Sequence, residues 1–235
     1  MKIVFLDEYS ICRRDLSSIK KFGDYIGYET TSPEQVLERC ADAEVVISNK
    51  VVLDAAIIAS LPKLRLICVA ATGMNNIDLN AAAEHGVEVR NAVGYSTYSV
   101  AETTICSALS LLREVTYYDN YFKSGEYAKS ERIFNFDRPP AQLRGKRWGI
   151  IGMGNIGREV ARLAEAFGCE VVYYSTSGVE RDEVYNKLSL NDLLNSSDVI
   201  SIHCPLNDRT HNLIDAEELA KMSVEEITEL YKSML

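Results

Sequence analysis

The chain has 235 residues, 47% of them hydrophobic and 25% charged, as in an ordinary globular protein, and its length fits one large domain or two small ones. This composition excludes collagen-like, coiled-coil and low-complexity proteins. The net charge of −9 repels phosphate backbones, so no nucleic-acid partner is expected.

Short runs rich in β-formers alternate with helical patterns in the first part of the chain, which is typical of a parallel sheet covered by helices. The expected strands cover residues 2–6, 44–48, 64–70 and 87–89. A helix is predicted over 33–40, because Ser32 can cap it, Pro33 suits its first position and Gln35 can reach back to the capping amide.

A longer helical pattern covers 99–122, with Ile105, Leu109 and Leu112 on its apolar side, and an irregular linker follows over 132–142. The pattern then restarts as strand 148–151, helix 156–167, strand 170–174, helix 190–195 and strand 199–203. This βαβαβ order predicts half of a doubly wound dinucleotide fold. We therefore expect a smaller α/β domain over 1–95 and a nucleotide-binding domain over 96–235.

The segment GMGNIG at 152–157 is a GxGxxG motif placed directly after an apolar strand and at the start of an amphipathic helix. Gly152 permits the tight turn, Gly154 lets a pyrophosphate approach the backbone, and Gly157 lets helix and strand pack closely. The helix N-terminus offers unpaired amides to phosphates. Dinucleotide binding is the prediction, and a merely structural glycine turn is the alternative.

The second strand of a dinucleotide fold is expected to end in an acid about 20 residues after the motif, which holds the ribose hydroxyls of NAD. Here the strand runs into the sequence STSG at 175–178, with Arg181 nearby and no acid. Since a carboxylate there would repel the 2′-phosphate of NADP, its absence leaves both NAD and NADP open.

A second constellation is AATGMNNID at 70–78, which follows a buried strand. Backbone amides of such a turn can bind a small carboxylate, and the alternative is that Asn75 and Asn76 only form a turn and cap a helix. Asn49 and Lys50 follow the preceding strand and are candidates for the same rim, unless Lys50 is an ordinary solvated lysine.

The six cysteines form no CxxC pair and no metal-ligand spacing, so reduced cysteines and no metal are expected, while a zinc site assembled from distant residues stays open. The apolar run before Asp7 is too short for a signal peptide, and no stretch approaches the ~18 apolar residues of a membrane span. We expect a cytoplasmic protein without a membrane partner.

Together these segments resemble the D-isomer-specific 2-hydroxyacid dehydrogenase family, most closely its glycerate dehydrogenase and hydroxypyruvate reductase branch. The resemblance covers about residues 1–222. It rests on the segment at 70–78, on NAVGYSTYSVAETT at 91–104, on GKRWGIIGMGNIGREVARLAEAFG at 145–168 and on HCPLNDRTHNLID at 203–215. It implies an α/β fold, with a Rossmann-type doubly wound parallel sheet and a smaller flavodoxin-like N-terminal domain.

The resemblance implies hydride transfer between NAD or NADP and a small 2-hydroxy or 2-keto acid of the glycerate, hydroxypyruvate or glyoxylate type, in a homodimer built around the helix beginning near Ser99. It places the substrate carboxylate on amides at Thr72, Gly73 and Met74, beside the rim candidates Asn49 and Lys50. The implied cofactor contacts are Thr104, the motif residues Gly152, Met153, Gly154, Asn155, Ile156 and Gly157, then Ser175, Thr176, His203, Cys204, Pro205 and Thr210.

The family's catalytic arginine, acid and histidine all lie after the segment corresponding to Met222, and this chain ends 13 residues later, in SVEEITELYKSML. We therefore expect a C-terminally truncated member whose sheet is incomplete on that side, with an uncovered apolar edge at 199–203 that a tail helix partly covers. Little or no turnover is expected from this chain alone. The alternative is a non-catalytic dinucleotide-binding remnant or partner subunit.

The chain has three histidines, and none is expected to replace the missing catalytic groups. His85 precedes Gly86 at a predicted helix end and is interpreted as a capping residue. His203 ends a predicted strand on the adenosine side in the family layout, or is simply packed in the core, and His211 lies in the following loop.

Overall fold

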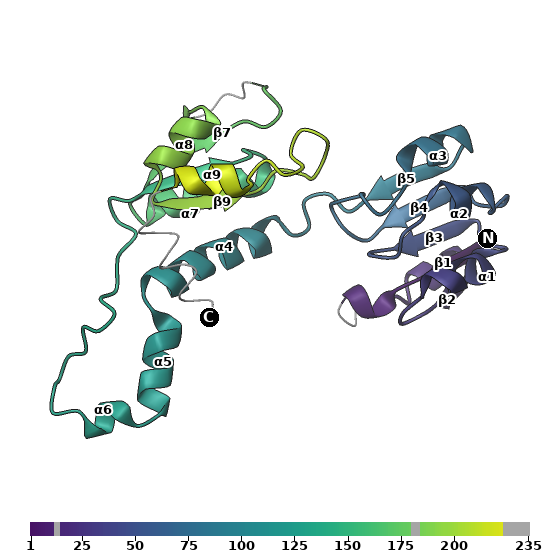
Figure 1. The fold of residues 1–235 in the computed structure, drawn as a ribbon. Coiled ribbons are helices and arrows are strands. Elements are labelled where there is room, and N and C mark those ends of the chain that lie inside the picture. The colour runs from purple at the N-terminus through teal and green to yellow at the C-terminus, as the bar shows by residue number, and fades with distance from the viewer. Residues whose placement is uncertain (12–14, 180–183, 223–235) are drawn as a thin grey trace. The chain divides into compact units, whose positions relative to one another are not determined.

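The computed structural model describes residues 1–11, 15–179 and 184–222 (Figure 1). The chain divides into two compact units, Met1–Tyr95 and Ser96–Leu235. Each unit contains its own parallel sheet and its own buried apolar cluster.

The first unit is built on a five-stranded parallel sheet in the order β2-β1-β3-β4-β5, the order of flavodoxin-like folds, which confirms the expected class. Its strands are β1 (Lys2–Phe5), β2 (Asp24–Gly27), β3 (Val45–Ser48), β4 (Leu66–Val69) and β5 (Glu88–Asn91). Four of them were predicted from the sequence. The exception is β2, a half-exposed edge strand that lacks the apolar run of the others.

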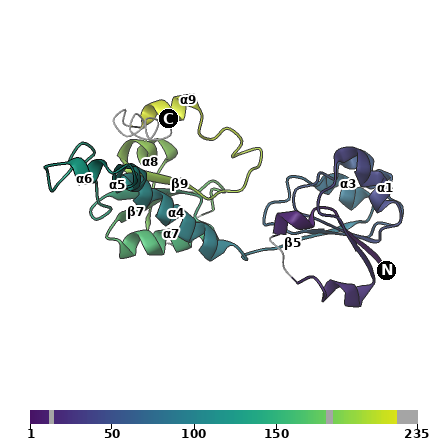
Figure 2. The same ribbon diagram turned by 90° about the horizontal axis from the view of Figure 1, so that it is seen from below.

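The helices of this unit are α1 (Val36–Cys40), α2 (Ala55–Ala59) and α3 (Leu79–Glu84), of which Figure 2 shows α1 and α3 on one side of the sheet. They bury Val36, Ile58 and Ala82 against strand residues of the same cluster. The predicted start of α1 is confirmed as a short 3-10 turn over Pro33–Gln35, where the Ser32 amide donates to Gln35 Oε1 at 3.1 Å.

The second unit contains a four-stranded parallel sheet in the order β8-β7-β6-β9. Its strands are β6 (Arg147–Ile151), β7 (Glu170–Tyr174), β8 (Asn186–Lys187) and β9 (Val199–Ile202). The helices that connect or follow these strands are α7 (Asn155–Ala166), α8 (Leu190–Ser196) and α9 (Ala216–Lys221). The chain passes from β6 through β7 to β8 and then returns to the other side of β6. This reversal makes the sheet doubly wound and creates a switch point beside β6.

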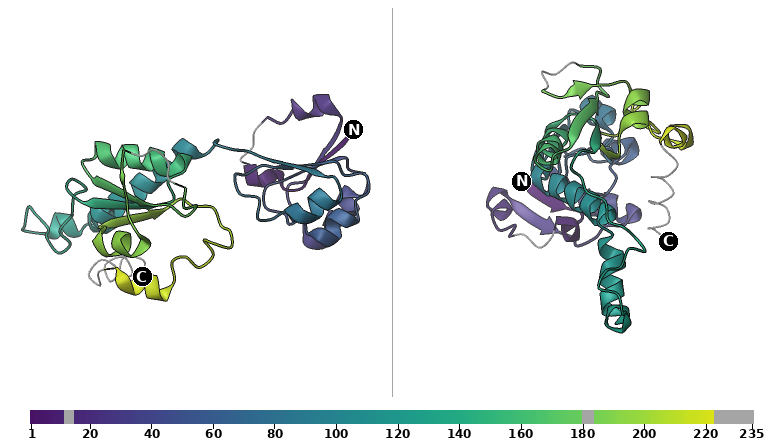
Figure 3. Two further views of the ribbon diagram at one scale, coloured as in Figure 1. Left: turned by 90° about the horizontal axis from the view of Figure 1, so that it is seen from above. Right: turned by 90° about the vertical axis from the view of Figure 1, so that its left-hand side faces the viewer.

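Helices cover both faces of this second sheet (Figure 3). Because side chains alternate along a strand, Trp148 and Ile150 face one side, where α7 and α4 (Thr97–Leu112) pack. Ile151 and Val172 face the opposite side and contact Leu193 of α8. This arrangement leaves the carboxyl ends of the strands uncovered by helices.

The single helix predicted over 99–122 is wrong, because the structure has α4, then α5 (Val115–Lys123) and α6 (Glu126–Lys129). Glu114 adopts a left-handed conformation, with φ of 52°, and interrupts the helix. Part of the 132–142 linker meets this break: the Ala141 amide donates to the Leu112 carbonyl at 2.7 Å, and Arg138 pairs with Glu114 at 3.3 Å. The linker therefore donates to the Leu112 carbonyl, which in a continuous helix would accept a hydrogen bond from the next turn.

Strand β9 lies at the edge of the four-stranded sheet, as predicted. A groove of about 840 Å³ runs between β9 and α4, lined among others by Thr104, Leu112, Ile200 and Met222. The predicted tail helix lies outside the described residues. None of the helices described in the structure is long and apolar enough to cross a membrane.

Candidate functional site

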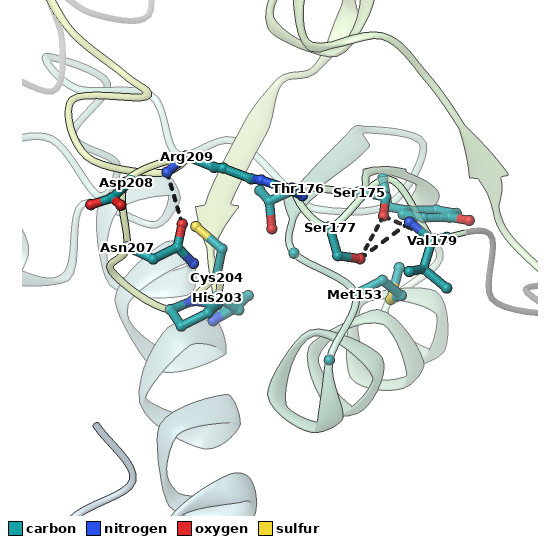
Figure 4. Close-up of a pocket in the computed structure, with 14 residues that line it drawn as sticks. Met153, Ser175, Thr176, Ser177, Val179, His203, Cys204, Asn207, Asp208 and Arg209 are labelled. Atoms are coloured by element: carbon teal, nitrogen blue, oxygen red, sulfur yellow. Dashed lines mark hydrogen bonds between the residues drawn. The ribbon is translucent and has the colours of Figure 1, made fainter. Parts of the chain in front are cut away.

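A pocket of about 480 Å³ lies at the carboxyl edge of the second sheet (Figure 4). Three loops form it: the glycine turn after β6, the segment at 175–179 after β7, and the segment at 203–209 after β9. Since all three strands are parallel, their ends meet at this edge, beside the switch point where open α/β sheets bind ligands.

Two glycines of the motif are required by packing. Gly152 has φ of +98°, and a Cβ there would lie 2.7 Å from the backbone nitrogen of Cys204. A Cβ on Gly157 would lie 2.3 Å from the carbonyl oxygen of Gly152. The turn after β6 is thus pressed against both the β9 loop and the first turn of α7.

Gly154 differs, because a Cβ there would meet no atom of the described chain within 4 Å. It is the N-cap of α7, no side chain caps the helix, and the amides of Asn155, Ile156 and Gly157 have no intrahelical acceptor. Open space in front of unpaired amides at a positive helix end fits an anionic group such as a pyrophosphate. The residues present therefore fit a dinucleotide.

The loop after β7 presents hydroxyl groups to the same pocket. The Ser175 hydroxyl donates to the Val179 carbonyl at 3.1 Å, and the Val179 amide donates to the Ser177 hydroxyl at 3.3 Å. The Thr176 hydroxyl makes no hydrogen bond to a described residue. Such a loop can donate and accept hydrogen bonds at a sugar or phosphate without adding negative charge.

Thr210 organises the loop after β9 from inside. Its hydroxyl donates to the Pro205 carbonyl at 2.5 Å and accepts from the Asn207 amide at 2.9 Å, and its side chain is buried. Thr210 does not line the pocket, although the resemblance placed it there. Its position instead fixes the turn that carries Asn207, Asp208 and Arg209 to the pocket rim.

His203 follows β9 and lines both this pocket and the groove beside α4. Its Nε2 atom is buried and has no hydrogen-bond partner among the described residues. Burial lowers the pKa of His203, because the imidazolium loses hydration that nothing in the described surroundings replaces. The imidazole is therefore neutral at physiological pH.

The buried His203 makes the stability of the chain depend on pH. Its pKa is lower in the folded than in the unfolded state, so the unfolded state binds more protons below the ordinary histidine pKa. The free energy of unfolding therefore falls as the pH falls from that value toward the lower pKa of the folded state. We expect unfolding free energies from urea denaturation to drop more between about pH 7.5 and 5.5 in the wild type than in His203→Gln. His211→Gln, which alters an exposed loop residue, serves as the control. Equal slopes in wild type and His203→Gln would refute the assignment.

The pocket brings together eight of the residues expected from the sequence: Gly152, Met153, Gly154, Ser175, Thr176, His203, Cys204 and Pro205. Thr104 lies instead on α4 and lines the neighbouring groove together with His203. Six further residues complete the lining and were not assigned as cofactor contacts from the sequence: Tyr173, Ser177, Val179, Asn207, Asp208 and Arg209. The sequence feature that points to Asn207, Asp208 and Arg209 is the run of polar residues after β9, because that strand ends beside the glycine turn.

The carboxyl edge of the first sheet holds the other expected constellation. Asp7, which follows β1, is buried and accepts hydrogen bonds from the amides of Asn49 at 2.9 Å and Lys50 at 2.6 Å. These bonds hold the loop after β3 against the end of β1. Asp7 is thus a structural carboxylate that sequence reasoning did not single out.

Beside this loop, the segment after β4 exposes Thr72 and Gly73 and half-buries Met74. The amides of these three residues make no hydrogen bond to another described residue, while the Asn91 side chain donates to the Thr72 carbonyl at 2.7 Å. Asp78, and neither Asn75 nor Asn76, caps α3 by accepting from the Ala81 amide. The segment therefore presents three consecutive unpaired amides.

His85 occupies the predicted position at the end of α3, as its C-cap, with Nδ1 2.9 Å from the Ala81 carbonyl oxygen. Among the described residues, no group of three or more histidines, cysteines and acids is placed to hold a metal ion. The described cysteines are free thiols: Cys40, Cys68, Cys106, Cys169 and Cys204.

A glycine turn between β6 and α7, at the switch point of a doubly wound sheet and in front of unpaired helix amides, defines a dinucleotide-binding domain. Residues 105–227 match the family model described as "D-isomer specific 2-hydroxyacid dehydrogenase, NAD binding domain". The chain belongs to the D-isomer specific 2-hydroxyacid dehydrogenase family, and its cofactor is NAD or NADP.

Individual relatives agree with this family. A putative 2-hydroxyacid dehydrogenase of Haemophilus influenzae is 39% identical over 94% of this chain and 70% of that protein. A hydroxypyruvate reductase of Blautia hydrogenotrophica is 34% identical over 94% and 71%. The solved D-lactate dehydrogenase of Aquifex aeolicus, complexed with NAD and lactic acid, superposes with a TM-score of 0.80 at 28% identity, over 94% of this chain and 66% of that one.

Proposed function

We propose that this chain serves reversible hydride transfer between a nicotinamide cofactor and a small D-2-hydroxy or 2-keto acid of the glycerate, hydroxypyruvate or glyoxylate type. The observation that carries the proposal is the open space at Gly154 in front of the unpaired amides of α7. The similarity to a hydroxypyruvate reductase supports the substrate class.

The two units are proposed to divide the work. Unit Ser96–Leu235 binds the cofactor, with Asn155 and Ile156 at the pyrophosphate, Ser175 and Thr176 at the adenosine ribose, and the loop after β9 as a wall. Unit Met1–Tyr95 binds the substrate carboxylate through the unpaired amides at 72–74, next to Asn49 and Lys50. Three amides in one turn suit a carboxylate because each donates to an anion.

Reduction of a 2-keto acid requires a hydride, which the bound cofactor supplies, a general acid for the forming alkoxide and a cation that polarises the carbonyl. By the resemblance, the acid and the cation belong to segments that follow Met222. Within the described pocket, His203 is neutral and buried, and so is a poor proton donor. We therefore expect the 235-residue polypeptide to bind cofactor and to turn over little, which is also the behaviour of a non-catalytic dinucleotide-binding protein.

The test is a titration of the 235-residue chain with NADH and with NADPH, followed by reduced-nicotinamide fluorescence, and then by absorbance after hydroxypyruvate or glyoxylate is added. We expect saturable binding of at least one cofactor and oxidation close to the uncatalysed rate. Turnover that His203→Gln abolishes would assign catalysis to a residue interpreted here as structural. The absence of binding to either cofactor would refute the proposal.

We also propose that two copies associate through the α4–α6 region. Its exposed aromatic side chains support this association, since contiguous exposed apolar surface marks interaction sites. They include Phe122 of α5 and Tyr127 of α6, and the following linker adds Phe134 and Phe136, with exposed fractions between 43% and 72%. The free thiols of the described cysteines support a reducing, cytoplasmic location.

A further inference from the structure

The rim of the dinucleotide pocket carries a positively charged side chain that is not part of the glycine turn or of the α7 N-terminus, where the pyrophosphate is expected. Arg209 lies in the loop after β9 and lines the pocket together with Ser175, Thr176 and Ser177 from the loop after β7. Figure 4 shows the Arg209 side chain extending across the pocket toward Thr176. A cation and three hydroxyl groups, supplied by loops that follow two separate strands, therefore meet at one end of the pocket.

Part of the hydrogen-bonding capacity of this cluster is unused, although the Ser175 hydroxyl donates to the Val179 carbonyl and the Ser177 hydroxyl accepts from the Val179 amide. The guanidinium of Arg209 makes no ion pair or hydrogen bond with any described residue, and only its backbone amide is engaged, by the Asn207 side chain at 2.9 Å. The Thr176 hydroxyl is also without a partner among the described residues. A guanidinium and a free hydroxyl group match the oxygens of a phosphate monoester, which accept charge-assisted hydrogen bonds.

Among the described residues that line the pocket, one side chain is acidic. Strand β7 ends at Tyr174 and is followed by Ser175, where a carboxylate would bind ribose hydroxyls and repel a phosphate. The acid among the described lining residues is Asp208, and Figure 4 shows its carboxylate directed away from Thr176. The chain as a whole carries a net charge of −9, but the positive charge of Arg209 on the pocket rim favours binding of an anion there.

We propose that Arg209, Thr176 and Ser175 bind the 2′-phosphate of NADP(H), so that the chain prefers NADPH to NADH. The inference rests on the proposed function, because it places the adenosine ribose beside the loop after β7. Arg209 acts as a specificity-determining residue: it contacts a group that NADP(H) carries and NAD(H) lacks.

The test measures dissociation constants of NADPH and NADH by isothermal titration calorimetry, for the wild type and for Arg209→Gln. We expect the wild type to bind NADPH at least about tenfold more tightly than NADH, as one charge-assisted contact provides. Arg209→Gln is expected to weaken NADPH binding by about tenfold or more and to leave NADH binding within about twofold. Because Arg209 is exposed, added salt should weaken wild-type NADPH binding more than NADH binding.

Arg144→Gln is the matched control. It removes the same charge from the same unit, but Arg144 precedes β6 and lies at the opposite edge of the sheet, beside Gly168. It should leave both dissociation constants and their ratio unchanged. A second variant, Ser175→Asp, adds a carboxylate at the end of β7 and should reverse the preference toward NADH.

The outcomes separate the inference from the function on which it rests. Equal binding of both cofactors by the wild type, or equal weakening of both by Arg209→Gln, would overturn the role of Arg209 while leaving the dinucleotide pocket in place. Failure of the folded wild type to bind either cofactor would overturn both. A wild-type preference for NADPH that only Arg209→Gln and Ser175→Asp remove would support the assignment.

Discussion

Gly154→Val is expected to weaken binding of the reduced cofactor by about 100-fold, equivalent to about 2.8 kcal/mol, while the chain stays folded. The side chain would enter the space in front of α7 where no atom of the described chain lies within 4 Å of the added Cβ. The φ of Gly154 is −88°, so the substitution causes no backbone strain. Fluorescence titration measures the affinity, and thermal unfolding without cofactor measures the fold.

A modest loss of stability should accompany this variant, about 1 kcal/mol, because valine is a poor N-cap residue. Gly154→Ala isolates that cost, since it changes the cap but fills less of the space. If Gly154→Val binds cofactor as tightly as the wild type, the pyrophosphate does not lie at this turn, and the placement of the cofactor is wrong.

Gly157→Ala, three residues away, is expected to act on the fold instead, lowering the free energy of unfolding by about 2–3 kcal/mol. The added Cβ would lie 2.3 Å from the Gly152 carbonyl oxygen, and this neighbour is backbone that no rotamer change can move. Helix α7 would have to separate from β6, which loosens the cluster around Trp148 and Val160. Urea denaturation of the chain without cofactor measures the effect.

The comparison with Gly154→Ala makes this second expectation specific. Both substitutions add one methyl group to the same motif, yet only that at Gly157 meets a fixed atom. Equal stability of the two variants would mean that α7 and β6 are less tightly packed than the structure describes.

Most of the fold follows from local sequence patterns. The apolar runs at β1, β3, β4, β6 and β7 and the capping pattern at Ser32 each carry a physical signal that a short window contains. β2 and β8 lack that signal, because the first is a half-exposed edge strand with a glycine and the second has two residues. The break at Glu114 depends on contacts from Arg138 and Ala141, which no window around the helix includes.

The site shows the same division. The glycine motif was readable because its three glycines serve one local turn, and the structure gives each a separate geometric reason. Asp7 and Arg209 were not assigned from the sequence, since Asp7 bonds to a loop, and Arg209 shares a pocket with a loop, more than 30 residues away along the chain. Their contribution arises only from parallel strands whose ends are brought to one edge.

The separate apolar clusters of the two units have a consequence for how the chain melts. One cluster lies within residues 4–87 and the others within 101–222, so each unit carries its own enthalpy of unfolding. Two-state unfolding with a single Tm is therefore not assumed for the whole chain. A cofactor that binds only the second unit raises the transition of that unit by mass action and leaves the other where it was. A calorimetric trace of this protein is therefore to be fitted with one transition for each unit, of which the second reports ligand.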